Sequence, residues 1–279
     1  MTTSAARPAE RPALLARNFV STAGNAQGPV VLFAHGFGCD QDMWRRLLPS
    51  FADDYRAVLF DHIGAGRSDL ASYDPARHTT LAGYTDDLLQ LCDSMGLREV
   101  TLVAHSVSAM MAVSAAVQRP DLFTRLVLVA PSPCYIDDPD DGYVGGFSRA
   151  DIDELLTSLD HNYFAWAAAM APVVMGADAP ELGNELAASF CRTDPDIARD
   201  FARVTFLTDS RPLLPRLRTP ALILQCTDDA LAPTEVGRYL HAQLAGSTLV
   251  QLAATGHCPH VSAPNETAEA IHTFLRSTP

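Results

Sequence analysis

One turn, within residues 100–118, constrains the fold of this chain more than any other feature of its sequence. A largely apolar, strand-like run at residues 100–104 leads into His105 and Ser106, and small residues with helical character follow. A serine placed between a buried strand and the start of a helix is pushed outward at the carboxyl edge of the sheet. This arrangement is typical of a nucleophile elbow.

Two interpretations of Ser106 are open at this point. The usual elbow has glycine two residues before and two residues after the nucleophile, whereas this chain has Ala104 and Ser108. Both residues are small, so strand and helix still pass closely. A serine that only caps the free N–H groups of an ordinary helix would fit the same pattern. The choice depends on whether catalytic partners for Ser106 occur further along the chain.

The composition excludes several classes of protein. The chain has 279 residues and a net charge of −13, and its 20 Lys and Arg residues form no cluster. Nucleic acids and anionic membranes need basic patches, so we expect neither as a partner. No run approaches the roughly 18 apolar residues of a membrane span, and six scattered cysteines indicate reduced thiols. We therefore expect a cytoplasmic protein.

Strand-like and helix-like runs alternate along most of the chain, which is typical of βαβ units and a parallel sheet. The alternation stops between residues 132 and 216, where helical segments replace it. Such an insertion usually forms a lid over the carboxyl edge of the sheet. We predict an α/β fold with residues 1–131 and 216–279 as the two parts of the core and residues 132–215 as the lid.

Loops that follow strands carry the side chains needed for nucleophilic catalysis. Ser106, the pair Asp228 and Asp229, and His257 each follow a strand-like run, so a parallel sheet brings them to one edge. Their order along the chain, Ser then Asp then His, is that of α/β-hydrolases. The joint pattern therefore favours a catalytic Ser106 over a helix cap.

These residue types suit acyl transfer. A serine hydroxyl is a poor nucleophile, so His257 would take its proton while an aspartate fixes the imidazole. The backbone N–H groups of Val107 and Phe37 would hold the oxyanion. Glycines on both sides of Phe37 permit the backbone conformation that aims its N–H inward.

The residues alone offer more than one candidate for the acid. Asp228 and Asp229 are adjacent and do not both face His257. Asp137 or Asp138, in the loop after an earlier strand, is a further candidate for the acid.

Other motifs do not suggest a cofactor or a metal. The glycine-rich stretch 64–69 lacks the third glycine and the helix of a dinucleotide site. The stretch 257–260 has no second ligand cluster with zinc spacing. We expect no cofactor and no metal, and we interpret His35 as a hydrogen-bonded loop residue and His62 as structural.

Several stretches together resemble one family. They are residues 35–44, 59–69, 105–108, 131–135, 145–147, 191–195, 224–226 and 256–260. These stretches resemble the family of the bacterial stress regulator RsbQ and the plant strigolactone and karrikin receptors. The resemblance implies an α/β-hydrolase core with a four-helix lid inserted after the sixth strand, over an apolar pocket. It places the triad on Ser106, Asp229 and His257, with the acid four residues before Pro233.

The resemblance and the apolar faces of the insertion suggest a substrate pocket. We expect it to be lined by Phe37, Phe147, Phe164, Trp166, Phe190 and Phe206. The leading hypothesis is a serine hydrolase of the carboxylesterase or lactonase type that acts on a small hydrophobic ester or lactone. The alternatives are a ligand-sensing signalling protein in sigma-factor stress regulation, with a regulatory phosphatase docking at the lid, and a carbon–carbon bond hydrolase or perhydrolase.

Overall fold

The computed structural model describes residues 11–176 and 180–277. Its strands are β1 (Ser21–Gly24), β2 (Val30–Ala34), β3 (Arg56–Leu59), β4 (Val100–His105), β5 (Phe123–Val129), β6 (Ala221–Asp228) and β7 (Ser247–Thr255). They form one seven-stranded sheet in the order β1-β3-β2-β4-β5-β6-β7. Only β1 runs antiparallel to its neighbour. The predicted α/β fold with a mostly parallel sheet is confirmed.

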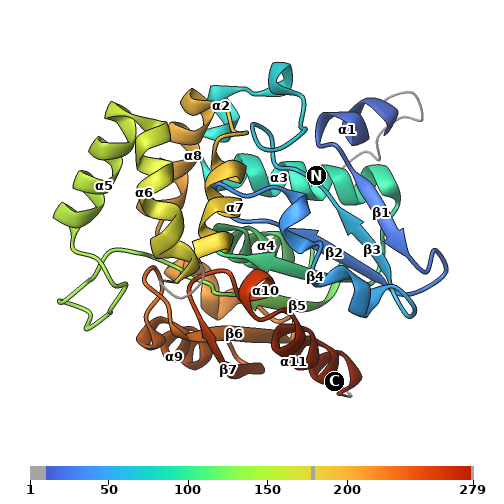
Figure 1. Ribbon diagram of the computed structural model, residues 1–279. Coiled ribbons are helices and arrows are strands. Elements are labelled where there is room, and N and C mark those ends of the chain that lie inside the picture. The colour runs from blue at the N-terminus through green and yellow to red at the C-terminus, as the bar shows by residue number, and fades with distance from the viewer. Residues whose placement is uncertain (1–10, 177–179, 278–279) are drawn as a thin grey trace.

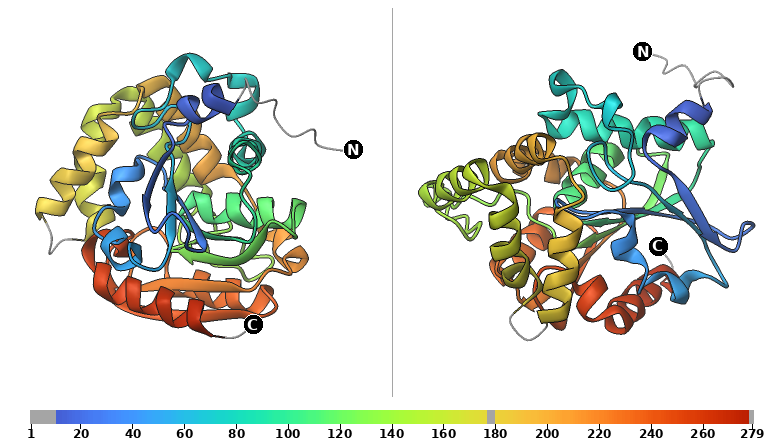
Figure 2. Two further views of the ribbon diagram at one scale, coloured as in Figure 1. Left: turned by 90° about the vertical axis from the view of Figure 1, so that its right-hand side faces the viewer. Right: turned by 45° about the horizontal axis from the view of Figure 1, so that its top comes forward.

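Helices cover both faces of this sheet. The α-helices are α1 (Arg11–Arg17), α2 (Pro75–His78), α3 (Leu81–Met95), α4 (Val107–Gln118), α5 (Arg149–His161), α6 (Tyr163–Met175), α7 (Pro180–Phe190), α8 (Pro195–Leu207), α9 (Thr234–Gln243), α10 (Pro259–Ser262) and α11 (Pro264–Arg276). Short 3-10 helices are η1 (Gln41–Trp44), η2 (Leu48–Phe51), η3 (Leu70–Ser72) and η4 (Arg211–Arg216). Figure 2 shows α3 and α11 on opposite sides of the sheet.

Alternating side chains of the central strands explain why both faces are covered. Leu32 and Leu102 pack into the core beneath α3, α4 and α9. Val31 and Val103 point to the other face, where they pack with residues of η1, η2 and α11. Strands that are apolar on both sides must be buried on both sides, which requires a helical layer on each face.

The helical insertion lies between β5 and β6, and Figure 1 shows α5 to α8 grouped at one end of the sheet. The insertion therefore follows the fifth described strand, and the expected position after the sixth strand is corrected. That ordinal came from the resemblance, whereas the apolar runs of the sequence number five before residue 132. The boundaries of the lid at residues 132–215 remain a prediction, and α5 to α8 all lie within them. Among the described helices, none combines the length and apolar character needed to cross a bilayer.

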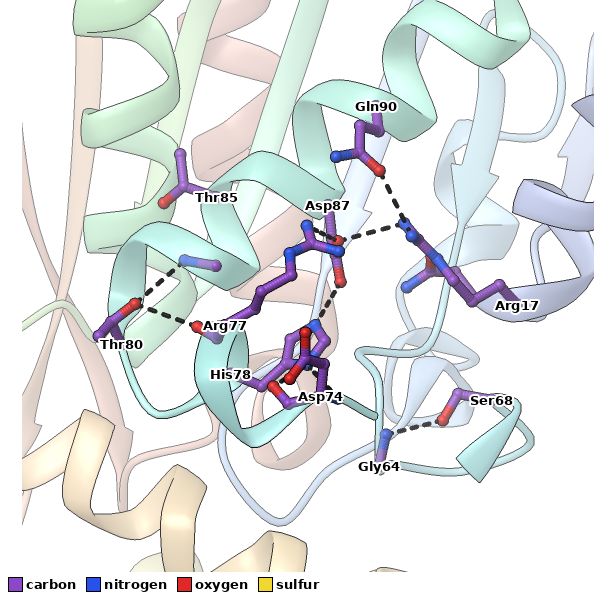
Figure 3. Close-up of polar contacts among 12 residues, drawn as sticks. Arg17, Gly64, Ser68, Asp74, Arg77, His78, Thr80, Thr85, Asp87 and Gln90 are labelled. Carbon is purple, nitrogen blue, oxygen red and sulfur yellow. Dashed lines mark hydrogen bonds and ion pairs between the residues drawn. The ribbon is translucent and has the colours of Figure 1, made fainter. Parts of the chain in front are cut away.

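A buried carboxylate joins the first three helices to one another. Asp87 of α3 lies 2.9 Å from His78 Nε2 and 2.8 Å from a guanidinium nitrogen of Arg77. It also pairs with Arg17 of α1 at 3.2 Å, and Figure 3 shows these partners converging on it. Asp87 is 3% exposed. A charge this deeply buried is tolerated because several partners surround it.

Replacing Asp87 with alanine is expected to lower the free energy of unfolding by about 3–5 kcal/mol, because the largely buried Arg17 loses its counter-charge and the buried His78 loses its hydrogen-bond partner. Urea unfolding followed by circular dichroism measures the loss. Asp93→Ala is the matched control on the same helix, because Asp93 pairs with Arg119 where both side chains are about a quarter exposed. That control is expected to lose at most about 1 kcal/mol. Equal losses in the two variants would contradict the role assigned to Asp87.

Candidate active site

Ser106 occupies a strained backbone position between β4 and α4. Its φ is 57° and its ψ is −124°, in a region that residues with a side chain rarely adopt. The neighbours two residues away, Ala104 and Ser108, are fully buried. A small side chain at each of these positions is therefore sufficient here, and the turn has the shape of a nucleophile elbow.

The structure brings Ser106, His257 and Asp229 into one hydrogen-bonded chain. His257 Nε2 lies 2.8 Å from Ser106 Oγ. The other ring nitrogen, Nδ1, lies 2.8 Å and 3.0 Å from the two carboxylate oxygens of Asp229. Because Nδ1 faces a carboxylate, it carries the ring proton and leaves Nε2 to accept from the serine hydroxyl.

The carboxylate of Asp229 is kept ionised by its surroundings. Burial by itself raises the pKa of Asp229, but the facing His257 and the backbone N–H groups of Leu231 and Ala232 lower it more. The net result is a pKa below the ordinary value for aspartate. Oδ1 accepts the two N–H groups at 2.9 Å and 3.1 Å, which also fixes the orientation of the carboxylate.

The remaining candidates for the acid lie elsewhere. Asp228 is exposed at the end of β6, whereas Asp229, the next residue, is buried. Asp137 accepts hydrogen bonds from two glycine N–H groups in its own loop. Asp138 forms an ion pair with Arg211. The structure therefore places only Asp229, among these four aspartates, against His257.

Two backbone N–H groups beside Ser106 have no acceptor among the described residues. Val107 is the first residue of α4, where the N–H has no intrahelical partner. Phe37 lies in the loop after β2, and its N–H likewise makes no hydrogen bond within residues 11–176 and 180–277. At Gly36, an added Cβ would lie 2.5 Å from His105 Nδ1 and 3.1 Å from Ser106 Cβ. The loop therefore approaches the elbow as closely as a glycine allows.

Ser108 fixes the loop after β2 through a hydrogen bond to its backbone. Its hydroxyl donates to the carbonyl of His35 at 2.5 Å and lies 2.8 Å from His62 Nε2. Burial, together with the neighbouring His35, lowers the pKa of His62 well below its ordinary value, so this imidazole is neutral. The serine that replaces an elbow glycine thus connects α4 to the loop that carries Phe37.

A partly enclosed apolar cavity reaches Ser106. It is lined by Phe37, Cys39, His105, Ser106, Tyr135, Trp166, Met170, Val174, Leu186, Phe190, Thr205, Phe206, Leu231, His257 and Cys258. The lid rests directly on the loop after β2, because an added Cβ at Gly38 (φ +72°) would lie 1.8 Å from Phe190 Cε1. Lid and core therefore form the cavity together.

Four of the six aromatic residues expected at the pocket line this cavity, and two do not. Phe164 is 52% exposed and lies on the outer side of α6. Phe147 is half-buried in a separate surface groove against α5 and α6. We correct the expectation for these two residues. The position of Phe164 could not be predicted, because α6 is apolar on all sides and has no polar face to mark its outside.

A model of the alpha/beta hydrolase family matches residues 31–270 of this chain. The chain belongs to the alpha/beta hydrolase family. A karrikin insensitive 2 receptor of Petunia hybrida is 40% identical over 88% of this chain and 91% of its own length. A strigolactone esterase of Arabidopsis thaliana is 38% identical over 88% and 92%. The solved structure of a hydrolase from Oleispira antarctica is 39% identical, covers 96% of this chain and 98% of its own, and superposes with a TM-score of 0.93.

With a serine at the elbow, this α/β-hydrolase is a serine hydrolase. Its relatives place it near the strigolactone and karrikin receptors, as the sequence motifs predicted. Within the described residues, no group of three or more His, Cys, Asp and Glu side chains is arranged to hold a metal ion.

Tyr135 is a residue of this hydrolase site that sequence reasoning missed. Its hydroxyl lies 3.2 Å from Ser106 Oγ, and the ring is 2% exposed. Burial raises the pKa of this phenol, so it is neutral and able to donate. Its place in the sequence could have identified it, because Tyr135 follows a strand, as Ser106 and His257 do, and so lies at the carboxyl edge of the sheet.

The Tyr135→Phe variant is expected to lower kcat/KM about 2- to 10-fold, because it removes one neutral hydrogen bond to Ser106 Oγ. Initial rates with a chromogenic ester measure the change. Tyr143→Phe is the control, because this buried tyrosine donates to the carbonyl of Cys134 and does not line the cavity. A loss above roughly 100-fold would exceed one hydrogen bond and refute this assignment.

Proposed function

We propose that this hydrolase cleaves small, neutral, hydrophobic esters or lactones through an acyl-enzyme on Ser106. The observation that carries the proposal is the continuous Asp229–His257–Ser106 chain, which ends inside an apolar cavity. No lysine, arginine, aspartate or glutamate is among the residues that line this cavity. A charged substrate would lose its hydration there without gaining a partner, whereas a neutral apolar one loses little.

The reaction follows from the geometry. Ser106 Oγ attacks the acyl carbon while His257 Nε2 takes the hydroxyl proton. The negative oxygen that develops is held by the N–H groups of Phe37 and Val107. The C–O bond to the leaving group then breaks, and His257 returns the proton to the departing alkoxide. Water, activated by the same imidazole, releases the acid and restores Ser106.

A fluorophosphonate probe tests the nucleophile, and an ester panel tests the substrate class. Peptide mapping is expected to find the probe on Ser106, with no labelling of Ser106→Ala. In the panel, neutral acyl chains are expected to react faster than carboxylate-bearing chains of equal length. Peracid formation and diketone cleavage are assayed in parallel, because the same triad serves perhydrolases and carbon–carbon bond hydrolases. Equal behaviour of wild type and Ser106→Ala would refute the proposal.

The outer surface of α6 supports a second candidate function, which is ligand-dependent signalling in the cytoplasm. In this function a regulatory phosphatase would dock at the lid, as in an RsbQ-like stress pathway. No residue of α6 has a polar side chain apart from the tyrosine and tryptophan ring groups. Phe164 is 52% and Val173 is 49% exposed, at the two edges of its outer side, and the apolar residues Ala165, Ala168 and Ala169 between them are exposed as well. Exposed apolar surface of this kind marks interaction sites. The similarity of this chain to a karrikin insensitive 2 receptor also supports a signalling function.

Charged substitutions on the outer surface of α6 distinguish the hydrolase function from the signalling function. A Phe164→Glu, Val173→Glu double variant is expected to hydrolyse esters like wild type, because neither side chain lines the cavity. In a pull-down, immobilised wild-type protein is expected to bind a phosphatase from an extract of the source cells, measured as phosphatase activity on the resin. The double variant is expected to bind none. Retention of no phosphatase by wild type would reject the signalling function and leave the hydrolase function intact.

A further inference from the structure

An imidazole outside the hydrogen-bonded triad lies where three loops of the site meet. His105 is the last residue of β4, directly before Ser106, and it is 2% exposed. Its Nε2 lies 2.9 Å from the carbonyl oxygen of His257, which is 152 residues further along the chain. His105 therefore connects the strand end that carries the nucleophile to the loop that carries the catalytic imidazole.

The acceptor determines the direction of this hydrogen bond. A carbonyl oxygen only accepts, so Nε2 of His105 carries a hydrogen and donates it. Cys258 Sγ lies farther from Nε2, at 3.9 Å, so the carbonyl is the main acceptor. The other ring nitrogen, Nδ1, is buried and has no hydrogen-bond partner within residues 11–176 and 180–277. The ring therefore makes its main polar contact with the backbone of His257.

The backbone of His257 is fixed at both of its polar groups. Its N–H donates to the carbonyl of Val174, in α6, at 2.7 Å. Its carbonyl accepts from His105, and no other hydrogen bond to this carbonyl is found in the described part of the chain. An unpaired buried carbonyl is costly. Without the His105 donor, the loop that bears the catalytic ring is therefore expected to shift toward another donor.

The edge of the same ring packs against the loop after β2. An added Cβ at Gly36 would lie 2.5 Å from Nδ1 and 3.0 Å from Cε1 of His105. The ring thus occupies the space that a side chain at position 36 would need. The next residue is Phe37, whose N–H we assign to the oxyanion. One ring therefore contacts the loops of the oxyanion donor and of the catalytic imidazole, and it is covalently next to the nucleophile.

We propose that His105 is a positioning residue for hydrolysis, whose Nε2–H fixes the backbone of His257 so that the catalytic ring stays within reach of Ser106. This inference rests on the acyl-enzyme function proposed above. His257 Nε2 lies 2.8 Å from Ser106 Oγ, and a displacement of about 1 Å at reacting groups lowers rates roughly 100-fold. His105 transfers no proton itself and acts only through His257.

A neighbouring histidine supplies a matched control. His260 is fully buried, and its ring centroid lies 4.5 Å from that of His105 and 4.4 Å from that of Trp44. Neither of its ring nitrogens has a hydrogen-bond partner among the residues that the structure describes, and it does not line the cavity. The two histidines therefore share burial and packing but differ in the hydrogen bond. His260→Phe keeps an aromatic ring at this place and is expected to keep the kcat of wild type.

The test compares two amides that place their N–H groups at different points. The amide nitrogen of glutamine falls where Nε2 of histidine lies, whereas that of asparagine falls near Nδ1. His105→Asn therefore loses the donor to His257, and it is expected to lower kcat and the rate of fluorophosphonate labelling of Ser106 about 10- to 100-fold, with KM unchanged. His105→Gln keeps the donor and is expected to recover most of both rates.

Stability is measured for every variant, and rates are referred to the folded protein. Thermal unfolding by circular dichroism gives the folded fraction. If His105→Asn does not fold, His105→Leu replaces it in the comparison, because leucine also lacks the donor and leaves no polar atom of its own unpaired. The split between kcat and KM and the recovery by glutamine would not be produced by a general loss of stability.

Three results would overturn the proposal. They are equal rates for His105→Gln and the variant that lacks the donor, a rise in KM at unchanged kcat, and a loss in His260→Phe as large as that in His105→Asn. The labelling rate separates this proposal from the function on which it rests. Wild type that is not labelled at Ser106 would refute the hydrolase function, whereas labelled wild type with equally labelled His105 variants would refute only the role of His105.

Discussion

The Ser106→Ala variant is expected to hydrolyse a chromogenic ester with kcat about a millionfold below wild type, and His257→Ala is expected to fall by a similar factor. The two side chains act as one unit, because Nε2 accepts the proton of the hydroxyl 2.8 Å away. Without the hydroxyl there is no nucleophile, and without the imidazole the hydroxyl keeps its proton. The double variant should therefore be no slower than either single variant.

Single-turnover and steady-state rates measure these effects. Ser114→Ala is the matched control, because Ser114 lies on the same helix, α4, and does not line the cavity. It is expected to retain full activity. Additive losses in the double variant would show that Ser106 and His257 act separately, which would contradict the hydrogen-bonded chain.

The Asp229→Asn variant is expected to lower kcat about 10⁴-fold while leaving the fold intact. An amide at this position offers an N–H to His257 Nδ1, so the ring turns to the wrong tautomer and Nε2 no longer accepts from Ser106. The carboxylate also stabilises the imidazolium that forms during attack, and an amide does not.

The adjacent aspartate supplies the control for this prediction. Asp228→Asn is expected to remain within about twofold of wild type, because Asp228 is exposed and makes no hydrogen bond with the His257 ring among the described residues. Thermal unfolding of both variants checks that the fold is retained. A large loss in Asp228→Asn with a small loss in Asp229→Asn would reverse the assignment of the acid.

The fold and the grouping of the candidate triad were predictable because both follow from strands. Apolar runs such as β4, buried along its whole length, require helices on both faces of the sheet. The loops after parallel strands then meet at one edge, wherever they occur in the chain. Ser106 and His257 are 151 residues apart and are nevertheless in hydrogen-bond contact.

Features that depend on the rotation of a helix or the burial of one residue were not predictable. The outward position of Phe164 depends on how α6 packs, and an all-apolar helix has no periodicity to show it. The choice between Asp228 and Asp229 came from the family spacing, and the structure gives its physical basis in their different burial. The contact of Ser108 with His35 joins two distant segments through one hydroxyl, which no local pattern encodes.

The absence of a side chain at Gly38 allows the lid to pack directly on the loop after β2. Phe190 of α7 fills the space that a Cβ would occupy, so the lid helix presses on the backbone next to Phe37. A side chain at position 38 would therefore displace either Phe190 or the loop that carries Phe37, so this one glycine sets how closely the lid and the core meet beside Ser106.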